Sequence, residues 1–118
     1  MGLMEMDKLI LKDPHIALPD RAAMAQVLVA HVYDVRLEEM RASTRMRPRA
    51  ALARQVAMYL SHVVLKMTLK ETAAAFGRDR STASYAFHHV EELRDDPKID
   101  RTLGWLERVL RSTVGAPQ

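Results

Sequence analysis

Residues 78–82, with the sequence RDRST, place five hydrogen-bonding side chains in succession. They follow an alanine-rich apolar run that breaks at Gly77, and a new apolar period begins directly after them. Arginine can donate two hydrogen bonds to the major-groove edge of guanine, and Ser and Thr hydroxyls can bond bases or phosphates. A helix that begins here also offers a phosphate its free N–H groups and dipole. These residue types favour contact with double-stranded DNA.

A second group of cations lies upstream. Arg45, Arg47 and Arg49 are spaced by two around Pro48 in the segment ASTRMRPRAA. An extended basic loop can lie along a minor groove, where narrow A·T tracts concentrate negative potential and attract arginine. A solubilising linker would have a similar composition. Two features suited to adjacent grooves favour DNA more strongly than either feature alone.

A short helix over residues 69–76 must support the RDRST segment. Thr68 and Glu71 fit a capping box, in which the threonine hydroxyl accepts from the third helical residue and the glutamate reaches back. Gly77 can end this helix because glycine adopts positive φ at no steric cost. The sequence therefore predicts a tight turn directly before RDRST.

A second helix follows the turn, with Asp79 or Ser81 as its N-cap, and it stops at RDDP because Pro97 disfavours helix in the residue before it. Its predicted buried face consists of Ala83, Ala86, Phe87, Val90 and Leu93. Its opposite face consists of Arg80, Ser81, Ser84, Tyr85 and His88. The two helices predict a helix-turn-helix at residues 69–94. Most such helix pairs are only packing units, but the basic surroundings here favour a DNA reader.

The remaining patterns are also helical. One helix covers residues 20–33, with Asp20 as its N-cap behind Pro19, and the segment RLEEMR forms a short turn after it. The predicted buried stripe of that first helix is Met24, Val27, Leu28, His31 and Val32. Ile99, Leu103, Leu106 and Leu110 define a last helix. No alternating strand pattern and no repeat occur, so the fold class is all-α.

A longer helix begins near Pro48, since proline is tolerated in a first helical turn. Its predicted buried stripe is Leu52, Val56, Tyr59, Leu60, Val63 and Val64. The residues expected to flank this stripe are Arg54, Gln55, Ser61 and His62. The chain thus divides into a flexible arm at residues 1–19, a helical domain at 20–111 and a flexible tail at 112–118.

The composition agrees with one small helical domain. The chain has 118 residues, of which 48% are hydrophobic, with only one Trp, three Tyr and two Phe. A core of Ala, Val, Leu and Met favours packed helices. Cysteine is absent, which excludes disulfides and thiolate metal sites and suits a cytoplasmic location. We expect no leader peptide and no membrane span.

Positive charge is concentrated in the middle of the chain. Residues 45–94 carry nine Lys/Arg against four Asp/Glu, whereas residues 1–44 carry five against seven and residues 95–118 carry four of each. The net charge of the whole chain is only +3. The basic centre therefore coincides with the predicted helix-turn-helix and suits an anionic partner, although membranes and acidic proteins attract such segments too.

The segment ARQVAMYLSHVVLKMTLKETAAAFGRDRSTASYAFHHVEELRDDP resembles the C-terminal DNA-binding domain (domain IV) of the bacterial replication initiator DnaA. The resemblance covers about residues 27–111, and its most specific pieces are RQVAMYL and GRDRSTASYA. It implies a small TrpR-like helical bundle. The family reads a short DNA box with its second helix in the major groove and a basic-loop arginine in the adjacent minor groove, so a nucleoid-associated protein is expected.

The resemblance also implies roles by position. The cluster that contacts bases and phosphates would be Arg78, Asp79, Arg80, Ser81 and Thr82. The residues along phosphates would be Gln55, His62, Lys70, Tyr85 and His89. Arg45 would enter the minor groove with Arg47 beside it, and Arg54 and His88 complete the DNA-binding candidates.

The chain departs from the family pattern in four places. Arg80 stands where the family has a histidine that packs on thymine, and arginine prefers guanine, so the preferred box is expected to differ. The turn lacks one of two usual glycines, and the loop between Arg45 and Arg54 is one residue longer. The fourth is the missing GxxxxGK[ST] loop of the initiator's ATPase module. We therefore expect no nucleotide cofactor and no ATP-driven origin melting, as in a stand-alone DnaA-like protein.

Three functions remain open at this stage. The first is a sequence-specific DNA binder that regulates transcription, and the second is a replication modulator that competes for initiator boxes. The third is a helical adaptor that binds a protein through the first or the last predicted helix. Trp105, Leu106 and Val109 could form its docking face, although an amphipathic helix covering its own core explains these residues as well. One helix-turn-helix reads few base pairs, so a homodimer or a protein partner would add specificity.

An enzyme is not predicted. His88 and His89 are adjacent, so they point about 100° apart on a helix and cannot share a metal ion. Ser81 has no histidine–carboxylate partner at a motif spacing. No catalytic residue, metal or cofactor is therefore assigned. The histidines can still modulate phosphate binding near neutral pH.

Overall fold

The computed structural model describes residues 18–42 and 47–114. This part of the chain contains six α-helices and no strand, as the all-α prediction requires. The helices are α2 (Leu18–Val32), α3 (Leu37–Arg41), α4 (Pro48–Val63), α5 (Leu69–Ala75), α6 (Arg80–Leu93) and α7 (Pro97–Val114). α2 begins inside the predicted arm and α7 continues into the predicted tail, so the helical part is slightly longer than residues 20–111.

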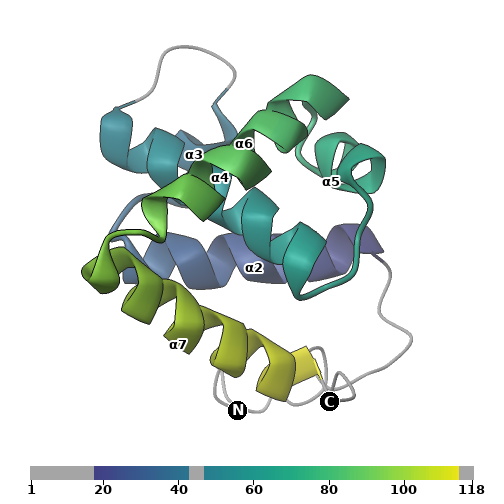
Figure 1. Cartoon of the computed structure of the whole chain (residues 1–118). Coiled ribbons are helices and arrows are strands. Elements are labelled where there is room, and N and C mark those ends of the chain that lie inside the picture. Colours follow the sequence, from purple (N-terminus) through teal and green to yellow (C-terminus); the bar gives the residue numbers. More distant parts are fainter. Residues whose placement is uncertain (1–17, 43–46, 115–118) are drawn as a thin grey trace.

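α4 is the central element. It begins at Pro48 as predicted, and it packs against α2, α3, α5 and α6 (Figure 1). Its buried residues are Ala50, Ala53, Val56, Ala57, Met58, Tyr59, Leu60 and Ser61. Ser61 was expected at the edge of the buried stripe, but it is fully buried and its hydroxyl donates to the Ala57 carbonyl oxygen at 2.9 Å. A helix enclosed by neighbours can bury a polar side chain that the backbone satisfies.

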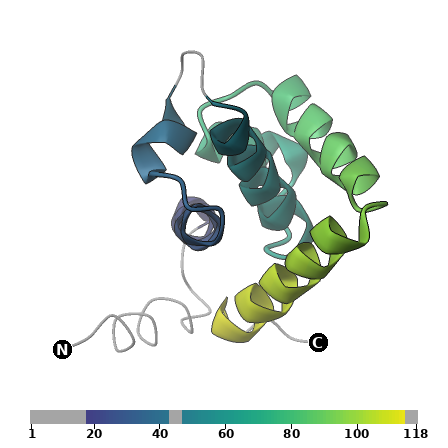
Figure 2. The ribbon, with the colours of Figure 1, turned by 90° about the vertical axis from the view of Figure 1, so that its left-hand side faces the viewer.

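The predicted buried face of α2 is wrong at two positions: Met24, Leu28 and Val32 are half-buried and pack against the core, but Val27 and His31 do not. Val27 is 55% exposed and His31 is exposed, whereas the buried side chains are Ala22, Ala25, Gln26, Val29 and Ala30. The alanines of α2 and α4 belong to the same core cluster, and small side chains let two helices approach closely. Figure 2 shows α2 end on, beside α4. Asp20 lies inside the first turn rather than at the N-cap, because α2 begins at Leu18.

α7 covers α2 along the side away from α3 (Figure 1). Leu103, Leu106 and Leu110 are buried, as the spacing predicted. Trp105 is 46% exposed, whereas Leu106 is fully buried, so Leu106 is not part of an exposed docking face on α7. In the part of the chain that the structure describes, no helix is both long and apolar enough to span a bilayer.

The alanine contact between α2 and α4 makes Ala53 sensitive to size. Ala53→Leu is expected to lower the free energy of unfolding by about 1–3 kcal/mol, because extra methyl groups overpack a fully buried position. Urea denaturation followed by circular dichroism measures the change. Val27→Ala, on the exposed face of α2, is the control and is expected to change stability by no more than about 0.5 kcal/mol. A larger loss of unfolding free energy for Val27→Ala would show that Val27 is buried, as the sequence predicted.

Candidate nucleic-acid interface

The first helix of the pair is built as predicted. The Thr68 hydroxyl accepts from the Glu71 N–H at 3.0 Å, and the Glu71 carboxylate accepts from the Thr68 N–H at 2.8 Å. Gly77 has φ +64°, and the Arg78 N–H donates to the Ala73 carbonyl oxygen at 2.8 Å. The turn between α5 and α6 therefore depends on a glycine and is closed by the backbone.

The second helix begins at Arg80, with Asp79 as its N-cap. Asp79 has the predicted position, but its carboxylate makes no capping hydrogen bond. The first N–H groups of α6 therefore remain open to an anion from outside. The two faces of α6 largely follow the prediction: Ala83, Ala86 and Val90 are buried, whereas Arg80, Ser81, Tyr85 and His88 are exposed. The other three predicted positions, Phe87, Leu93 and Ser84, are half-buried.

A polar network holds the other end of α6. The Tyr59 ring on α4 stacks on Phe87 with centroids 5.8 Å apart, and its hydroxyl bonds the Glu91 carboxylate. Burial raises the pKa of Tyr59 to about 12. Arg94 donates to the Tyr59 hydroxyl at 3.0 Å and to Glu107 of α7 at 2.9 Å. α4, α6 and α7 are thus joined at one point.

Arg94 is the centre of that network. Its Nε also donates to Asp100 at 2.6 Å, so one guanidinium contacts two carboxylates of α7. The hydrogen bond to Glu107 raises the pKa of Arg94 above the ordinary arginine value. The guanidinium stays charged at all working pH values, and its hydrogen bonds connect the end of α6 to α4 and α7.

Two arginines meet at the base of the turn. Arg54 on α4 and Arg78 are both half-buried, and the Nε atom of each is buried without a hydrogen-bond partner among the described residues. Burial, followed by the charge of Arg78, lowers the pKa of Arg54. Buried donors without acceptors, next to a like charge, are unfavourable unless an anion joins them. A phosphate oxygen is the acceptor that suits two guanidinium groups.

Arg78 also connects the turn to the basic loop. Its Nη2 donates to the carbonyl oxygen of Ala42, which lies 36 residues earlier and directly precedes the loop. Sequence reasoning missed this contact, because no side chain marks Ala42 as an acceptor. The turn before α6 and the residue that follows α3 are therefore neighbours in space.

The basic loop itself is described only at its end. Arg45, the predicted minor-groove residue, lies outside the described residues. Arg47 is exposed and donates to both carboxylate oxygens of Glu39 on α3, at 2.7 and 2.9 Å. These bonds raise the pKa of Arg47 and lower that of Glu39. Arg47 is therefore tethered to α3 in this structure.

The remaining candidates lie around the two helices. Lys70 is exposed near the start of α5, and Gln55 is half-buried beside Arg54 in the chain. Tyr85 is exposed and stacks on His89 with centroids 5.3 Å apart, a flat pair that the sequence did not reveal. Thr82 is half-buried at the start of α6. These positions are all on or next to the helix-turn-helix.

His62 has a structural contact that limits its predicted role. Its Nδ1 donates to the Met67 carbonyl oxygen at 2.6 Å, and its ring meets the Phe87 ring edge-on at 5.1 Å. Only Nε2 is left for a phosphate. Within residues 18–42 and 47–114, no group of three His, Cys, Asp or Glu residues could hold a metal ion.

Comparison with known proteins assigns this arrangement to a family. The family model described as "Bacterial dnaA protein helix-turn-helix" matches residues 23–90. Chromosomal replication initiator protein DnaA 1 of Protochlamydia amoebophila is 34% identical over 96 residues, which are 79% of this chain and 21% of that protein. DnaA of Laribacter hongkongensis is 37% identical over 89 residues, 74% of this chain and 18% of the relative. The chain thus spans about a fifth of the length of these relatives.

Proposed function

The chain belongs to the bacterial DnaA helix-turn-helix family, and from this membership we propose that it binds specific double-stranded DNA sites with α6 in the major groove. The observation that carries the proposal is the exposed start of α6. Arg80 and Ser81 project there, the first N–H groups are uncapped by a side chain, and the opposite face is held in the core. A helix of this kind places donors against base edges while its N-terminus meets a phosphate.

Each polar group at this end has a matching acceptor or donor on DNA. The Arg80 guanidinium suits the O6 and N7 atoms of guanine, and the Asp79 carboxylate, which makes no cap, can accept from the amino group of cytosine. Arg54 and Arg78 would share a backbone phosphate behind the helix. Arg45 and Arg47 would reach the adjacent minor groove, with Arg47 exchanging Glu39 for the DNA.

The phosphate role of Arg54 has a measurable signature. Arg54→Gln is expected to weaken binding to specific and random duplexes by a similar factor, and to reduce the slope of log affinity against log salt by about one. Fluorescence anisotropy over a salt series measures both. Arg101→Gln removes the same charge from the exposed side of α7 and should leave the slope unchanged. Equal slopes for wild type and Arg54→Gln would exclude this contact.

Selection of bound sequences from random duplexes tests the function itself. A recovered motif whose affinity falls steeply with salt supports site-specific binding. Failure to enrich any motif, together with salt-insensitive affinity, would refute it and leave the adaptor hypothesis. In that case the charge-reversing change Arg80→Glu would have no effect on the partner interaction.

The same selection separates two biological roles. Recovery of an initiator-type box would favour a replication modulator that competes for such boxes, in keeping with the names of the relatives. Recovery of a box with guanine in place of a thymine would favour a transcriptional regulator with its own sites. We propose the role of a transcriptional regulator with its own sites, because Arg80 replaces the histidine of the initiator pattern.

A further inference from the structure

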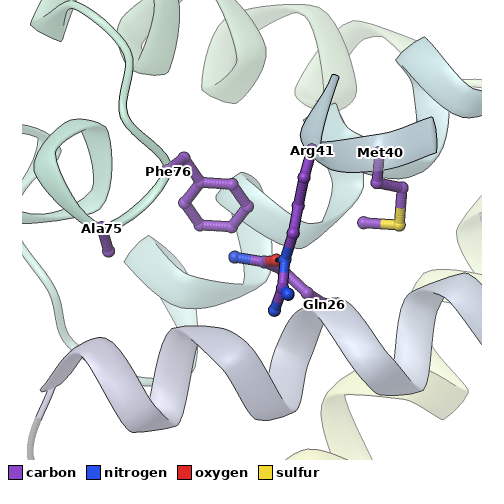
Figure 3. Close-up of a pocket in the computed structure, with 5 residues that line it drawn as sticks. All are labelled: Gln26, Met40, Arg41, Ala75 and Phe76. Carbon is purple, nitrogen blue, oxygen red and sulfur yellow. Dashed lines mark hydrogen bonds between the residues drawn. The ribbon is translucent and has the colours of Figure 1, made fainter. Parts of the chain in front are cut away.

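A pocket of about 240 Å³ lies between α2, α3 and the end of α5, apart from the exposed face of α6. Its lining consists of Gln26, Met40, Arg41, Ala75 and Phe76. The Arg41 side chain extends from α3 toward Gln26 of α2, and the Phe76 ring points toward both (Figure 3). DNA binding as proposed above uses none of these five residues.

The polar wall of the pocket contains an excess of hydrogen-bond donors. Gln26 is only 5% exposed, and its Oε1 accepts from the Arg41 Nε at 2.8 Å. Arginine cannot accept, so this bond fixes the orientation of the Gln26 amide and leaves its Nε2 as a donor. The two Nη atoms of Arg41 and this Nε2 have no hydrogen-bond partner among the described residues. Among the residues that the structure describes, no Asp or Glu lines the pocket.

The other wall is apolar and small. Met40 is buried, and Ala75 and Phe76 are half-buried at the end of α5. Pockets for drug-sized ligands measure about 300–1,000 Å³, so this one suits a smaller molecule. A carboxylate would pair with the guanidinium edge in charge-assisted bonds, and a flat or short apolar body would contact Phe76 and Met40.

We propose that this pocket binds a small monocarboxylate with an apolar body, of the size of benzoate or hexanoate. Its position also suggests a consequence for DNA binding. Arg41 precedes Ala42, whose carbonyl holds Arg78, and Phe76 is the C-cap that precedes Gly77 of the turn. A ligand there touches residues on both sides of the Ala42–Arg78 contact. The effect of the ligand on DNA binding rests on the proposed function, whereas the carboxylate-binding site does not.

Two-dimensional ¹H–¹⁵N NMR titration of the whole chain with benzoate, hexanoate and the neutral isostere benzamide tests the site. The carboxylates are expected to shift the amides of Gln26, Arg41 and Phe76 with a Kd on the order of 1 mM or tighter, and benzamide to bind at least about 10-fold more weakly. No saturable shift with either carboxylate, or equal binding of benzamide, would overturn the proposal.

Substitutions in the pocket lining test whether benzoate binds there. Arg41→Met keeps the length of the side chain but removes its charge, and is expected to weaken benzoate binding at least about 10-fold. Ala75→Leu fills the pocket without changing a charge and is expected to abolish binding even if Arg41→Met disturbs folding. Arg108→Met, on the exposed side of α7, is the matched control and should bind like the wild type. Unchanged binding by Ala75→Leu would place the ligand elsewhere and refute the site.

The link to DNA has a separate readout. Saturating benzoate is expected to change the affinity for the selected duplex by about 5-fold or more. An unchanged affinity would overturn the link but not the pocket. If the chain bound no DNA, the NMR titration would still decide whether the pocket exists, so the two proposals fail independently.

Discussion

Arg80→Ala is expected to weaken binding to the selected duplex by roughly 5- to 150-fold, while affinity for random duplex falls far less. A bidentate arginine–guanine contact discriminates against a wrong base by about 1–3 kcal/mol, and Arg80 is exposed at the first residue of α6, where it can make that contact. Anisotropy with the selected duplex and with a duplex changed at one base measures both quantities.

The control for Arg80→Ala is Arg108→Ala, which removes an exposed arginine from α7. It should leave the ratio of specific to random affinity unchanged. Arg80→His is the informative exchange, since it restores the residue of the initiator pattern and should shift the preferred base from guanine toward thymine. Retention of the guanine preference by Arg80→Ala would show that another residue reads this position.

Arg94→Met is expected to lower the free energy of unfolding by about 2 kcal/mol. The change leaves the Glu107 carboxylate, whose side chain is only 13% exposed, without its cation. Loss of one partner of a fully buried ion pair costs about 3–5 kcal/mol, and partial exposure of this pair reduces that cost. Urea denaturation followed by circular dichroism measures it.

A double-mutant cycle distinguishes the lost pair from simple loss of side-chain packing. Glu107→Leu in the Arg94→Met background is expected to recover a large part of the stability, because the unpaired carboxylate is then gone. Arg101→Met, an exposed change on α7, should stay within about 0.5 kcal/mol of the wild type. Full additivity of the two changes at Arg94 and Glu107 would contradict an energetic coupling between them.

The helix boundaries and the two faces of α6 were largely predictable, because short-range contacts decide them. The capping box at Thr68 and Glu71 and the positive φ of Gly77 each depend on residues within one helical turn. The inward and outward faces of α6 followed from its strong apolar period. The RDRST segment then predicted that the start of this helix meets DNA, and the family match independently identifies a helix-turn-helix over residues 23–90.

The buried face of α2 could not be read from the sequence. Val27 is larger and more hydrophobic than Ala25, yet Ala25 is buried and Val27 is exposed. The choice depends on how closely α2 and α4 approach, and alanines of both helices lie in the core cluster that joins them. A period of apolar residues records hydrophobicity but not the size that a partner helix can accommodate.

By itself, then, the sequence determined an all-α fold with a helix-turn-helix of the DnaA family and an arginine at the first residue of α6. The tertiary structure decided which residues lie beside Arg78 in the turn that precedes it. The charge of Arg78 acts on Arg54, which lies 24 residues earlier in the chain, and Arg78 donates to the Ala42 carbonyl oxygen, 36 residues earlier. Contacts of this kind arise because α4, the turn and the end of α3 pack at one corner of the bundle. Neither the type nor the spacing of these residues predicts such contacts, since only three-dimensional packing brings separate helices together.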